Sequence, residues 1–409
     1  MPSPLALRLR TATLRDSPAL LEPLERAFER TGAETELLRR LAEEDPRLDP
    51  SLALVAEDSG GAVLGYALCL PRTLHLFGRP TRLALIGPLA VVPAARRRGV
   101  GRFLVETARA ALAERSLRGA FALGAEPLFA ALGFAPAFGL SYLRVLRADL
   151  GPAGAATWRG LEGRDLEPCA ALYRRCYVHA DGSEERLPIA LDFAAAARNS
   201  HTLVLERAGE TVAYLRFRVR ETLELCECAA KDGDAAREVV AFLARLLDEH
   251  GQGSAEVRLG PDHPVARLLL GRGALSMQSQ LAGAATLSVV DWAGLVGDLG
   301  AHFEAVLTRH KVSACSLQLG GRNLRVQADG RGAWRVEQGG PVRGFHLAPA
   351  AHLVAGLFTG LHSFRDLGFD APLCAGSDLG AQGEALFAEL FPRRSPQWNF
   401  GPVFELADE

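Results

Sequence analysis

A run of arginines and glycines in the first quarter of the chain has the residue types and spacing of an anion-binding loop. The run follows Pro93 and consists of Arg96, Arg97, Arg98, Gly99, Val100, Gly101 and Arg102. Glycine has no Cβ, so a bulky anion can come close to the backbone there. Free N–H groups at the start of a helix and the positive end of the helix dipole also bind phosphate. The run therefore predicts a site for a phosphate-bearing ligand.

The flanking segments are those of a strand, a loop and a helix. Residues 83–92 are apolar and strand-like, and helical spacing follows the run at Phe103, Leu104, Ala108, Ala111 and Leu112. No lysine and hydroxyl residue follow the second glycine, so this is not a nucleotide P-loop, and the spacing of a dinucleotide site is also missing. The order Arg-x-x-Gly-x-Gly after Val-x-Pro resembles the acyl-CoA pyrophosphate loop of GNAT acetyltransferases. A ligand-free strand–loop–helix unit is the alternative.

Composition limits the class of protein. The chain has 409 residues, which favours two or three domains, and its 48% apolar and 23% charged residues are typical of a soluble globular protein. A formal net charge of −2 predicts no general attraction to nucleic acid or to an anionic membrane. The N-terminus lacks the pattern of a signal peptide, and no apolar run is long enough to span a bilayer.

Cysteine usage points to a reducing compartment. The seven cysteines are scattered, except for Cys226 and Cys228, which indicates free thiols in a cytoplasmic protein. The Cys226-Glu227-Cys228 stretch has the cysteine content of half a metal site. It lies in an alternating segment without a His or Cys partner at ligand spacing, so we interpret it as a strand and predict no metal.

Residues 1–150 have an element order similar to that of the GNAT fold. Strands are predicted near 6–12, 52–57, 62–70, 83–92, 120–124 and 142–147, and helices after Asp16, at 34–41, at 100–115 and at 127–132. The resemblance implies an acetyl-CoA-binding domain.

Residues 151–287 repeat this element order after a loop-like boundary at 151–154. Where the arginine loop would stand, however, the chain has Lys231, Asp232, Gly233 and Asp234. Carboxylates at this place repel a pyrophosphate. We therefore interpret this part as a degenerate GNAT-like domain that does not bind CoA.

Residues 288–409 are similar to a sterol-carrier-protein-like domain of the α+β class, with predicted strands at 316–319, 323–328 and 334–337 and helices at 350–357 and 383–391. Two tandem GNAT-like domains and such a C-terminal domain resemble the enhanced-intracellular-survival type of acetyltransferase from end to end. The resulting α/β (α+β) chain is expected to transfer an acetyl group from acetyl-CoA to a primary amine of a small molecule or a lysine. The resemblance also implies a homo-oligomer, often a hexamer.

The resemblance assigns cofactor roles to the loop and to the strand before it. It implies that the backbone of Leu89, Ala90 and Val91 binds the pantetheine arm of CoA. The pyrophosphate is then expected on the run Arg96 to Arg102 named above. In direct attack by an uncharged amine, a base removes the ammonium proton and an acid protonates the leaving thiolate.

The sequence departs from the family at both acid–base positions. Where the family has a tyrosine acid four residues before a glycine, this chain has Phe129 before Gly133, so the hydroxyl is absent. The family uses the carboxylate of a C-terminal phenylalanine as base, but here the chain continues past Phe404. Glu405 is the substitute that we expect.

Other candidates have a structural alternative that weighs more. Tyr66 and Tyr142 carry hydroxyl groups on predicted strands, and His75 is a candidate base, but packing explains all three. Glu25 and Glu29 lie on the helix that borders the acceptor in this fold, where a solvated helix face is the alternative to amine binding.

Two further function classes remain open. A non-catalytic acyl-CoA-binding or scaffold protein would keep the loop and lose the acid, and thiol release from acetyl-CoA with a panel of amines distinguishes it from an enzyme. A lipid carrier working through residues 288–409 would copurify with lipid.

Overall fold

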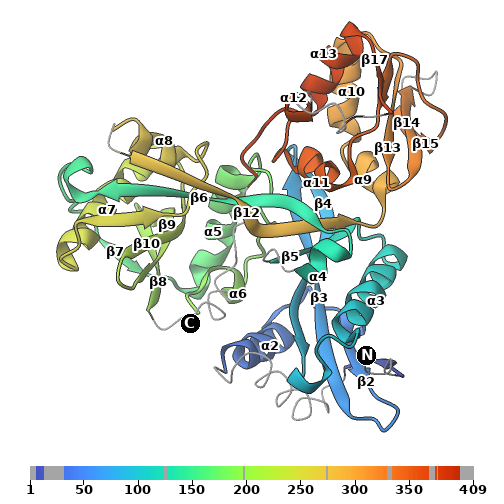
Figure 1. Cartoon of the computed structure of the whole chain (residues 1–409). Helices are drawn as coiled ribbons and strands as arrows, with labels where there is room; N and C mark the ends of the chain where they lie inside the picture. The colour runs from blue at the N-terminus through green and yellow to red at the C-terminus, as the bar shows by residue number, and fades with distance from the viewer. Residues whose placement is uncertain are drawn as a thin grey trace. The chain divides into compact units, whose positions relative to one another are not determined.

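The computed structural model describes residues 6–12, 32–123, 127–196, 199–272, 275–328, 334–367, 374 and 376–396, without the side chains of 33, 34 and 275–284. The chain forms two compact units. Unit 1 comprises Met1–Thr35, Arg47–Phe138 and Leu281–Pro396, and unit 2 comprises Glu36–Pro46, Gly139–Gln280 and Gln397–Glu409. Both units combine helices with sheets, so the predicted mixed α/β class is confirmed (Figure 1). The division at residues 150 and 287 stays a prediction.

The main sheet of unit 1 has the strand order β1-β2-β3-β4-β5-β12. Its strands are β1 Arg8–Thr11, β2 Ala53–Glu57, β3 Val63–Leu76, β4 Arg79–Val91, β5 Gly119–Leu123 and β12 Leu275–Val289. Strands β1 to β4 are antiparallel, β4 and β5 are parallel, and the last residues of β12 run antiparallel to β5. A parallel pair needs a crossover, and here the crossover is helix α3, Val100–Glu114.

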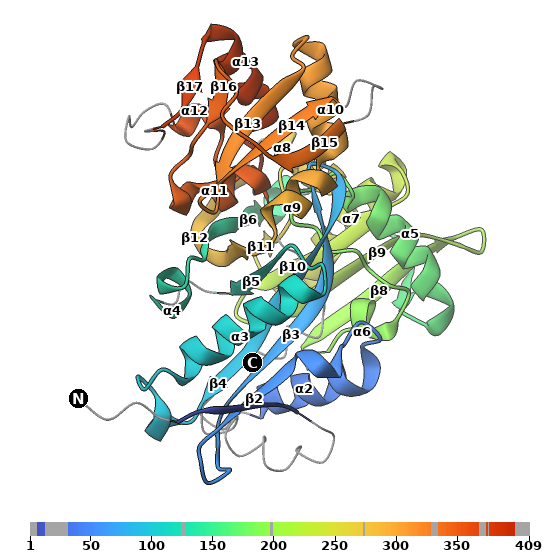
Figure 2. The same ribbon diagram turned by 90° about the vertical axis from the view of Figure 1, so that its right-hand side faces the viewer.

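Helix α3 forms because its apolar residues fall on one face. Val100, Leu104, Val105, Ala108 and Leu112 are buried and recur at helical spacing. They share a core with residues of β2 to β5. Figure 2 shows α3 lying along β3 and β4. The helix predicted after the arginine loop is therefore confirmed.

The β3–β4 hairpin is longer than the sequence predicts. Pro71 and Pro80 interrupt the strand pattern, because proline cannot donate a ladder hydrogen bond. In the structure both residues are accommodated, Pro71 opposite Ala84 and Pro80 opposite His75. The tip of the hairpin is the turn at Phe77 and Gly78, both with positive φ.

The remainder of unit 1 contains α4 Pro127–Ala131, the start of β6 Ala135–Leu146 and a second sheet. This sheet has the order β15-β14-β13-β16-β17. The strands are β13 Ala314–Leu319, β14 Arg322–Ala328, β15 Trp334–Gln338, β16 Phe345–Leu347 and β17 Asp378–Leu379. The helices are α9 Trp292–Asp298, α10 Gly300–Arg309, α11 Ala351–Thr359, α12 Phe364–Leu367 and α13 Ala381–Leu390. The three predicted strands and two predicted helices of this part are confirmed.

The sheet of unit 2 has the order β6-β11-β10-β9-β8-β7. Its other strands are β7 Trp158–Gly160, β8 Ser200–Arg207, β9 Glu210–Val219, β10 Leu223–Ala230 and β11 Ser254–Val257. Helices α5 Leu166–Tyr177, α6 Ala190–Phe193, α7 Gly233–Glu249 and α8 Pro264–Leu270 follow the predicted order, and residues of α2 Ala33–Glu44 also belong to this unit. β6 begins seven residues before the predicted strand at 142 and pairs with β11 through Leu143 to Leu146.

The Cys226-Glu227-Cys228 stretch lies in β10, as the strand interpretation predicts. Glu227 is 1% exposed and accepts a hydrogen bond of 2.8 Å from the Tyr214 hydroxyl. Arg186, equally buried, donates to the same carboxylate at 3.3 Å. Burial raises the pKa of both thiols. The stretch is thus part of a paired, buried polar core.

A buried histidine, His263, lies at the start of α8 in unit 2. His263 precedes α8, its Nδ1 accepts the N–H of Val265 at 3.2 Å, and burial lowers its pKa to about 4. The unfolded chain has a histidine pKa of about 6.5 and therefore binds this proton first as the pH falls.

We expect the free energy of unfolding to decrease from pH 6.5 downwards, by about 3 kcal/mol at pH 4 from this group alone. Asparagine at position 263 keeps a capping acceptor without titrating. Urea unfolding at pH 7 and pH 5 should therefore show a smaller acid loss for His263→Asn than for the native chain. Equal losses would contradict the assignment.

Candidate functional site

The arginine and glycine run joins the end of β4 to the start of α3. A short 3-10 turn, Pro93–Ala95, follows the strand, and the backbone then takes positive φ at Arg97 (60°) and at Gly99 (90°). Gly99 is the N-cap of α3, and its carbonyl accepts the first helical hydrogen bond, from the N–H of Phe103 at 2.9 Å. By helix geometry, the N–H groups of residues 100–102 have no carbonyl one turn earlier. They point out of the helix start, as an anion site requires.

The two glycines are needed for different reasons. A Cβ at Gly99 would meet open space, but the positive φ is one that other residues rarely adopt. A Cβ at Gly101 would lie 3.1 Å from Cδ2 of Leu128, so this glycine lets α3 pack against the residues around α4. Space for an approaching anion is therefore present at Gly99, whereas Gly101 serves packing.

The charge around the loop is positive. Arg96, Arg97, Arg98 and Arg102 are exposed, and the first turn of α3 contains no acidic residue. Arg96 donates to the carbonyl of Val91 at 3.3 Å, and Arg102 lies 3.3 Å from Glu106. Within the part of the chain that the structure describes, Arg97 and Arg98 have no hydrogen bond or ion pair. Their guanidinium groups are available to an anion.

The strand edge next to the loop is open. β4 pairs with β5 only at Ala84–Ala120 and Leu85–Phe121 among the described residues. Beyond these pairs, residues 89–91 pair with β3 on their other side, and a bulge near Leu68 interrupts that ladder. An extended chain with amide groups can therefore hydrogen-bond to β4 where β5 has left it. The predicted backbone site at Leu89, Ala90 and Val91 thus lies beside the loop.

Gly65 is a site residue that the sequence reading missed. It pairs with Val91, and a Cβ there would lie 2.9 Å from the Ala90 carbonyl oxygen, 2.9 Å from Cγ1 of Val100 and 3.1 Å from Cδ1 of Leu104. Only glycine lets the first turn of α3 come this close to the strand. An isolated glycine inside a strand pattern is the signal that marks such an approach.

Phe129 lies in the apolar core of unit 1. It is 6% exposed, and its ring packs against Phe134 with 5.1 Å between the ring centroids. A phenyl ring has no proton to give, so this position supplies no acid. Glu25, Glu29 and Glu405 lie outside the described residues.

The other candidates are Tyr66 and His75 on β3 of unit 1, and Tyr142 on the part of β6 that belongs to unit 2. Tyr66 is directly opposite Ala90 and 4% exposed, and burial raises its pKa, so it stays a neutral phenol. His75 pairs with Pro80, nine positions further along β3, which at the rise of a strand places it about 30 Å from Tyr66. Tyr142 lies under the guanidinium of Arg258, at 5.8 Å from its ring centroid. Of the three, Tyr66 alone pairs with one of the residues 89–91, but it does so from β3, on the side of β4 away from the open edge.

The corresponding place in unit 2 has no loop. β10 ends at Ala230, and α7 begins three residues later. Asp232 caps α7, because its Oδ1 accepts the N–H of Ala235 at 2.8 Å. A carboxylate of the chain itself occupies this helix start.

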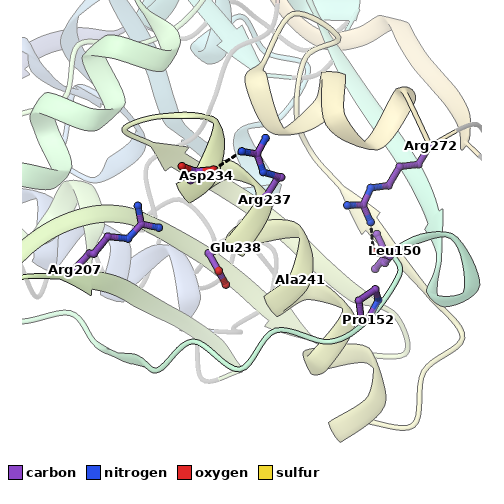
Figure 3. Close-up of a pocket in the computed structure, with 8 residues that line it drawn as sticks. All are labelled: Leu150, Pro152, Arg207, Asp234, Arg237, Glu238, Ala241 and Arg272. Carbon is purple, nitrogen blue, oxygen red and sulfur yellow. Dashed lines mark hydrogen bonds and ion pairs between the residues drawn. The ribbon is translucent and has the colours of Figure 1, made fainter.

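A groove of about 450 Å³ in unit 2 is also a poor match to a diphosphate (Figure 3). Its lining mixes both signs of charge: Arg207, Arg237 and Arg272 with Asp234 and Glu238. Arg237 pairs with Asp234, and Arg272 donates to the carbonyl of Leu150. Two of its three arginines are therefore engaged.

Two absences hold for the described residues. No three His, Cys, Asp or Glu side chains there are grouped as a metal site requires. The helices in these ranges are all too short or too polar to cross a membrane.

We expect Gly65→Ala to weaken CoA binding about tenfold, about 1.4 kcal/mol, because either the Ala90 carbonyl or the first turn of α3 must move. Gly160→Ala is the matched control, since this strand glycine of unit 2 faces open space. Isothermal titration with CoA measures both. An unchanged dissociation constant in a folded Gly65→Ala variant would show that this approach does not shape the site.

Comparison with known proteins also finds an acetyltransferase domain in the first part of the chain. Residues 8–137 match the family described as acetyltransferase (GNAT) domain. No curated protein matches the sequence. Solved structures share the fold over nearly the whole length.

A GCN5-related N-acetyltransferase from Anabaena variabilis has a TM-score of 0.74 at 14% identity, covering 96% of this chain and 98% of that one. One from Kribbella flavida has a TM-score of 0.73 at 16% identity, covering 96% and 97%. Eis1 from Mycobacterium abscessus has a TM-score of 0.65 at 18% identity, covering 97% and 99%. Residues 8–137, which contain the open edge of β4 and the arginine loop, therefore match the acetyltransferase (GNAT) domain family, and the chain shares the fold of these solved structures.

Proposed function

We propose that this protein is an N-acetyltransferase that moves an acetyl group from acetyl-CoA to a primary amine of a small molecule or a lysine. The observation that carries the proposal is the arginine loop at the start of α3, directly beside the strand edge that β5 leaves open. One end of this site offers N–H groups and guanidinium groups to a pyrophosphate. The other offers a backbone edge to the amides of a pantetheine arm. CoA has these two parts in this order.

In this proposal, the backbone of Leu89, Ala90 and Val91 binds the pantetheine arm. The pyrophosphate lies on the loop, bound by Arg96, Arg97, Arg98, Gly99, Val100, Gly101 and Arg102. The thioester is then held next to the β4 backbone, whose N–H groups polarise its carbonyl.

The chemical step is direct attack of the uncharged amine on the thioester carbonyl. The C–N bond forms, the C–S bond breaks and CoA leaves as a thiolate, while the amine loses one proton. A thiol pKa of about 8.5 makes the thiolate a tolerable leaving group without an acid. Glu405 is our candidate for the base, and Glu25 and Glu29 for holding the amine.

For the whole chain we infer the domain organisation of the enhanced-intracellular-survival type. Residues 1–150 would be the acetyl-CoA-binding domain, 151–287 a degenerate GNAT-like domain and 288–409 a sterol-carrier-protein-like domain. The capped start of α7 supports an empty second domain. We also infer a cytoplasmic homo-oligomer, with a hexamer as the family expectation.

One observation favours a second function. Phe129 is packed in the core without a hydroxyl, so the chain has lost the acid that the family uses at this position. A non-catalytic acyl-CoA-binding protein would need the loop alone. Release of thiol from acetyl-CoA in the presence of varied amines separates the two functions.

Replacing Arg97 and Arg98 together by alanine should weaken CoA binding at least tenfold, because two exposed guanidinium groups beside the pyrophosphate are lost. The effect should shrink as salt screens the charges. Arg174 and Arg175, exposed at the end of α5, make the matched control pair. Titration should give one CoA per chain. Two CoA per chain, or equal affinity in both double variants, would contradict the loop assignment.

Phe129→Tyr should raise the rate of acetyl transfer, by up to about 100-fold, because the new hydroxyl can protonate the thiolate. Phe134→Tyr adds a hydroxyl to the neighbouring ring and serves as control. Steady-state thiol release with an amine panel measures all three chains. If all bind CoA and none turns over, the binding-protein function is correct. A fast native enzyme that Phe129→Tyr does not accelerate would refute our account of the missing acid.

A further inference from the structure

Arg118 immediately precedes β5, and its backbone is hydrogen-bonded to two other parts of the chain. Its N–H donates to the carbonyl of Arg82 on β4 at 2.8 Å. Its carbonyl accepts the N–H groups of Val290 and Asp291, at 2.9 and 3.1 Å. The backbone of Arg118 therefore joins β4 to the segment that follows β12.

The side chain of Arg118 continues this connection. Its Nε and Nη2 donate to the two carboxylate oxygens of Asp298 at 2.9 and 3.0 Å, and Nη1 donates to Asp291 at 2.7 Å. These bonds raise the pKa of the guanidinium, with the hydrogen bonds to Asp298 as the largest cause and burial opposing them. A paired, planar arrangement of this kind fixes direction as well as distance.

The surroundings are shaped for this contact. Asp291 caps α9 by accepting the N–H of Gly294 at 2.9 Å. A Cβ on Gly294 would collide with both Asp291 and the Arg118 guanidinium. A Cβ on Gly119 would likewise lie 2.5 Å from the Ser288 carbonyl oxygen of β12. The start of β5 therefore packs closely against β12 and against the first turn of α9.

The start of β5 lies next to the point where β4 and β5 separate. Ala120 and Phe121 are the only β5 residues paired with β4 in the described ranges, and they follow Arg118 by two and three positions. At the rise of a strand, Arg118 is about 10 Å from the last pair. A shift of Arg118 would therefore also move the part of β5 that borders the gap between β4 and β5.

We propose that Arg118 is a positioning residue that sets the gap between β4 and β5, with Asp291 and Asp298 of the segment after β12 as its anchors. This inference rests on the proposed function, because the occupant of the gap is the pantetheine arm of CoA. The nucleotide end of CoA lies on the arginine loop and does not depend on the gap. Arg118 therefore controls affinity for one half of the cofactor only.

Isothermal titration with two ligands tests this: CoA, and adenosine 3′-phosphate 5′-diphosphate, which keeps the pyrophosphate and has no pantetheine. Arg118→Lys keeps the charge and loses the paired geometry, and Asp298→Asn removes one anchor charge at the same shape. Each should raise the dissociation constant of CoA about fivefold or more. The constant for the nucleotide without pantetheine should stay within about twofold, a split that general destabilisation does not produce.

Arg115→Lys is the matched control, since Arg115 bonds Asp49 and Ser51 at 3.2 and 2.8 Å at the other end of α3. It should change neither constant. Equal weakening of both ligands by the Arg118 and Asp298 variants, or no weakening of CoA, overturns the inference while the proposed function stands. Failure of the native chain to bind CoA refutes the proposed function itself, and this inference with it.

Discussion

The separation of β4 from β5 is the constraint on which the rest of unit 1 depends. Parallel pairing ends at Leu85 and Phe121, and after that β4 has a paired edge towards β3 and an open edge towards β5. Backbone N–H and C=O groups that lose their strand partner need another polar chain or water. The open edge of β4 can therefore hydrogen-bond an extended ligand that carries amides. The positive charge of the neighbouring arginine loop favours a ligand that also carries an anionic group.

Two close approaches set the shape of this opening. On one side, Gly65 lets the first turn of α3 lie against β3, so the helix start is near the open strand edge. On the other, Arg118 holds β5 at its root. Both depend on missing side chains, at Gly65 and at Gly294, because each added Cβ would occupy the place of a contact. Precision of this kind comes from packing rather than from the reactive groups themselves.

Unit 2 shows that topology alone does not produce the site. It has the same order of strands and a crossover helix, and its parallel pair β10–β11 also ends beside a bulge. There the chain enters α7 at once, under the cap of Asp232, and Glu227 is buried among Tyr214 and Arg186. The Asp232 carboxylate thus occupies the helix start, which in unit 1 is open to an anion. Function therefore follows the loop and its charges, not the fold.

By itself, the sequence determined those features whose residues are neighbours along the chain. The loop of Arg96 to Arg102, helix α3 and the loss of the tyrosine hydroxyl at Phe129 could all be predicted, because local periodicity, glycine conformation and side-chain chemistry act over a few residues. The length of the β3–β4 hairpin could not, since its prolines hide the strand pattern. The pairing of β12 with β5 could not be predicted either, because the two strands are far apart in the sequence.

Only the tertiary structure decided the roles of Gly65 and Arg118. Gly65 matters because Val100 comes to lie against it, and Arg118 because Asp298, 180 positions later in the chain, meets its guanidinium. No local pattern encodes such partners: each residue type is common, and the contact exists only once the sheet, α3 and α9 have packed. The chemistry of the loop thus depends on consecutive residues. The width and depth of the site are set by contacts between residues far apart in the sequence.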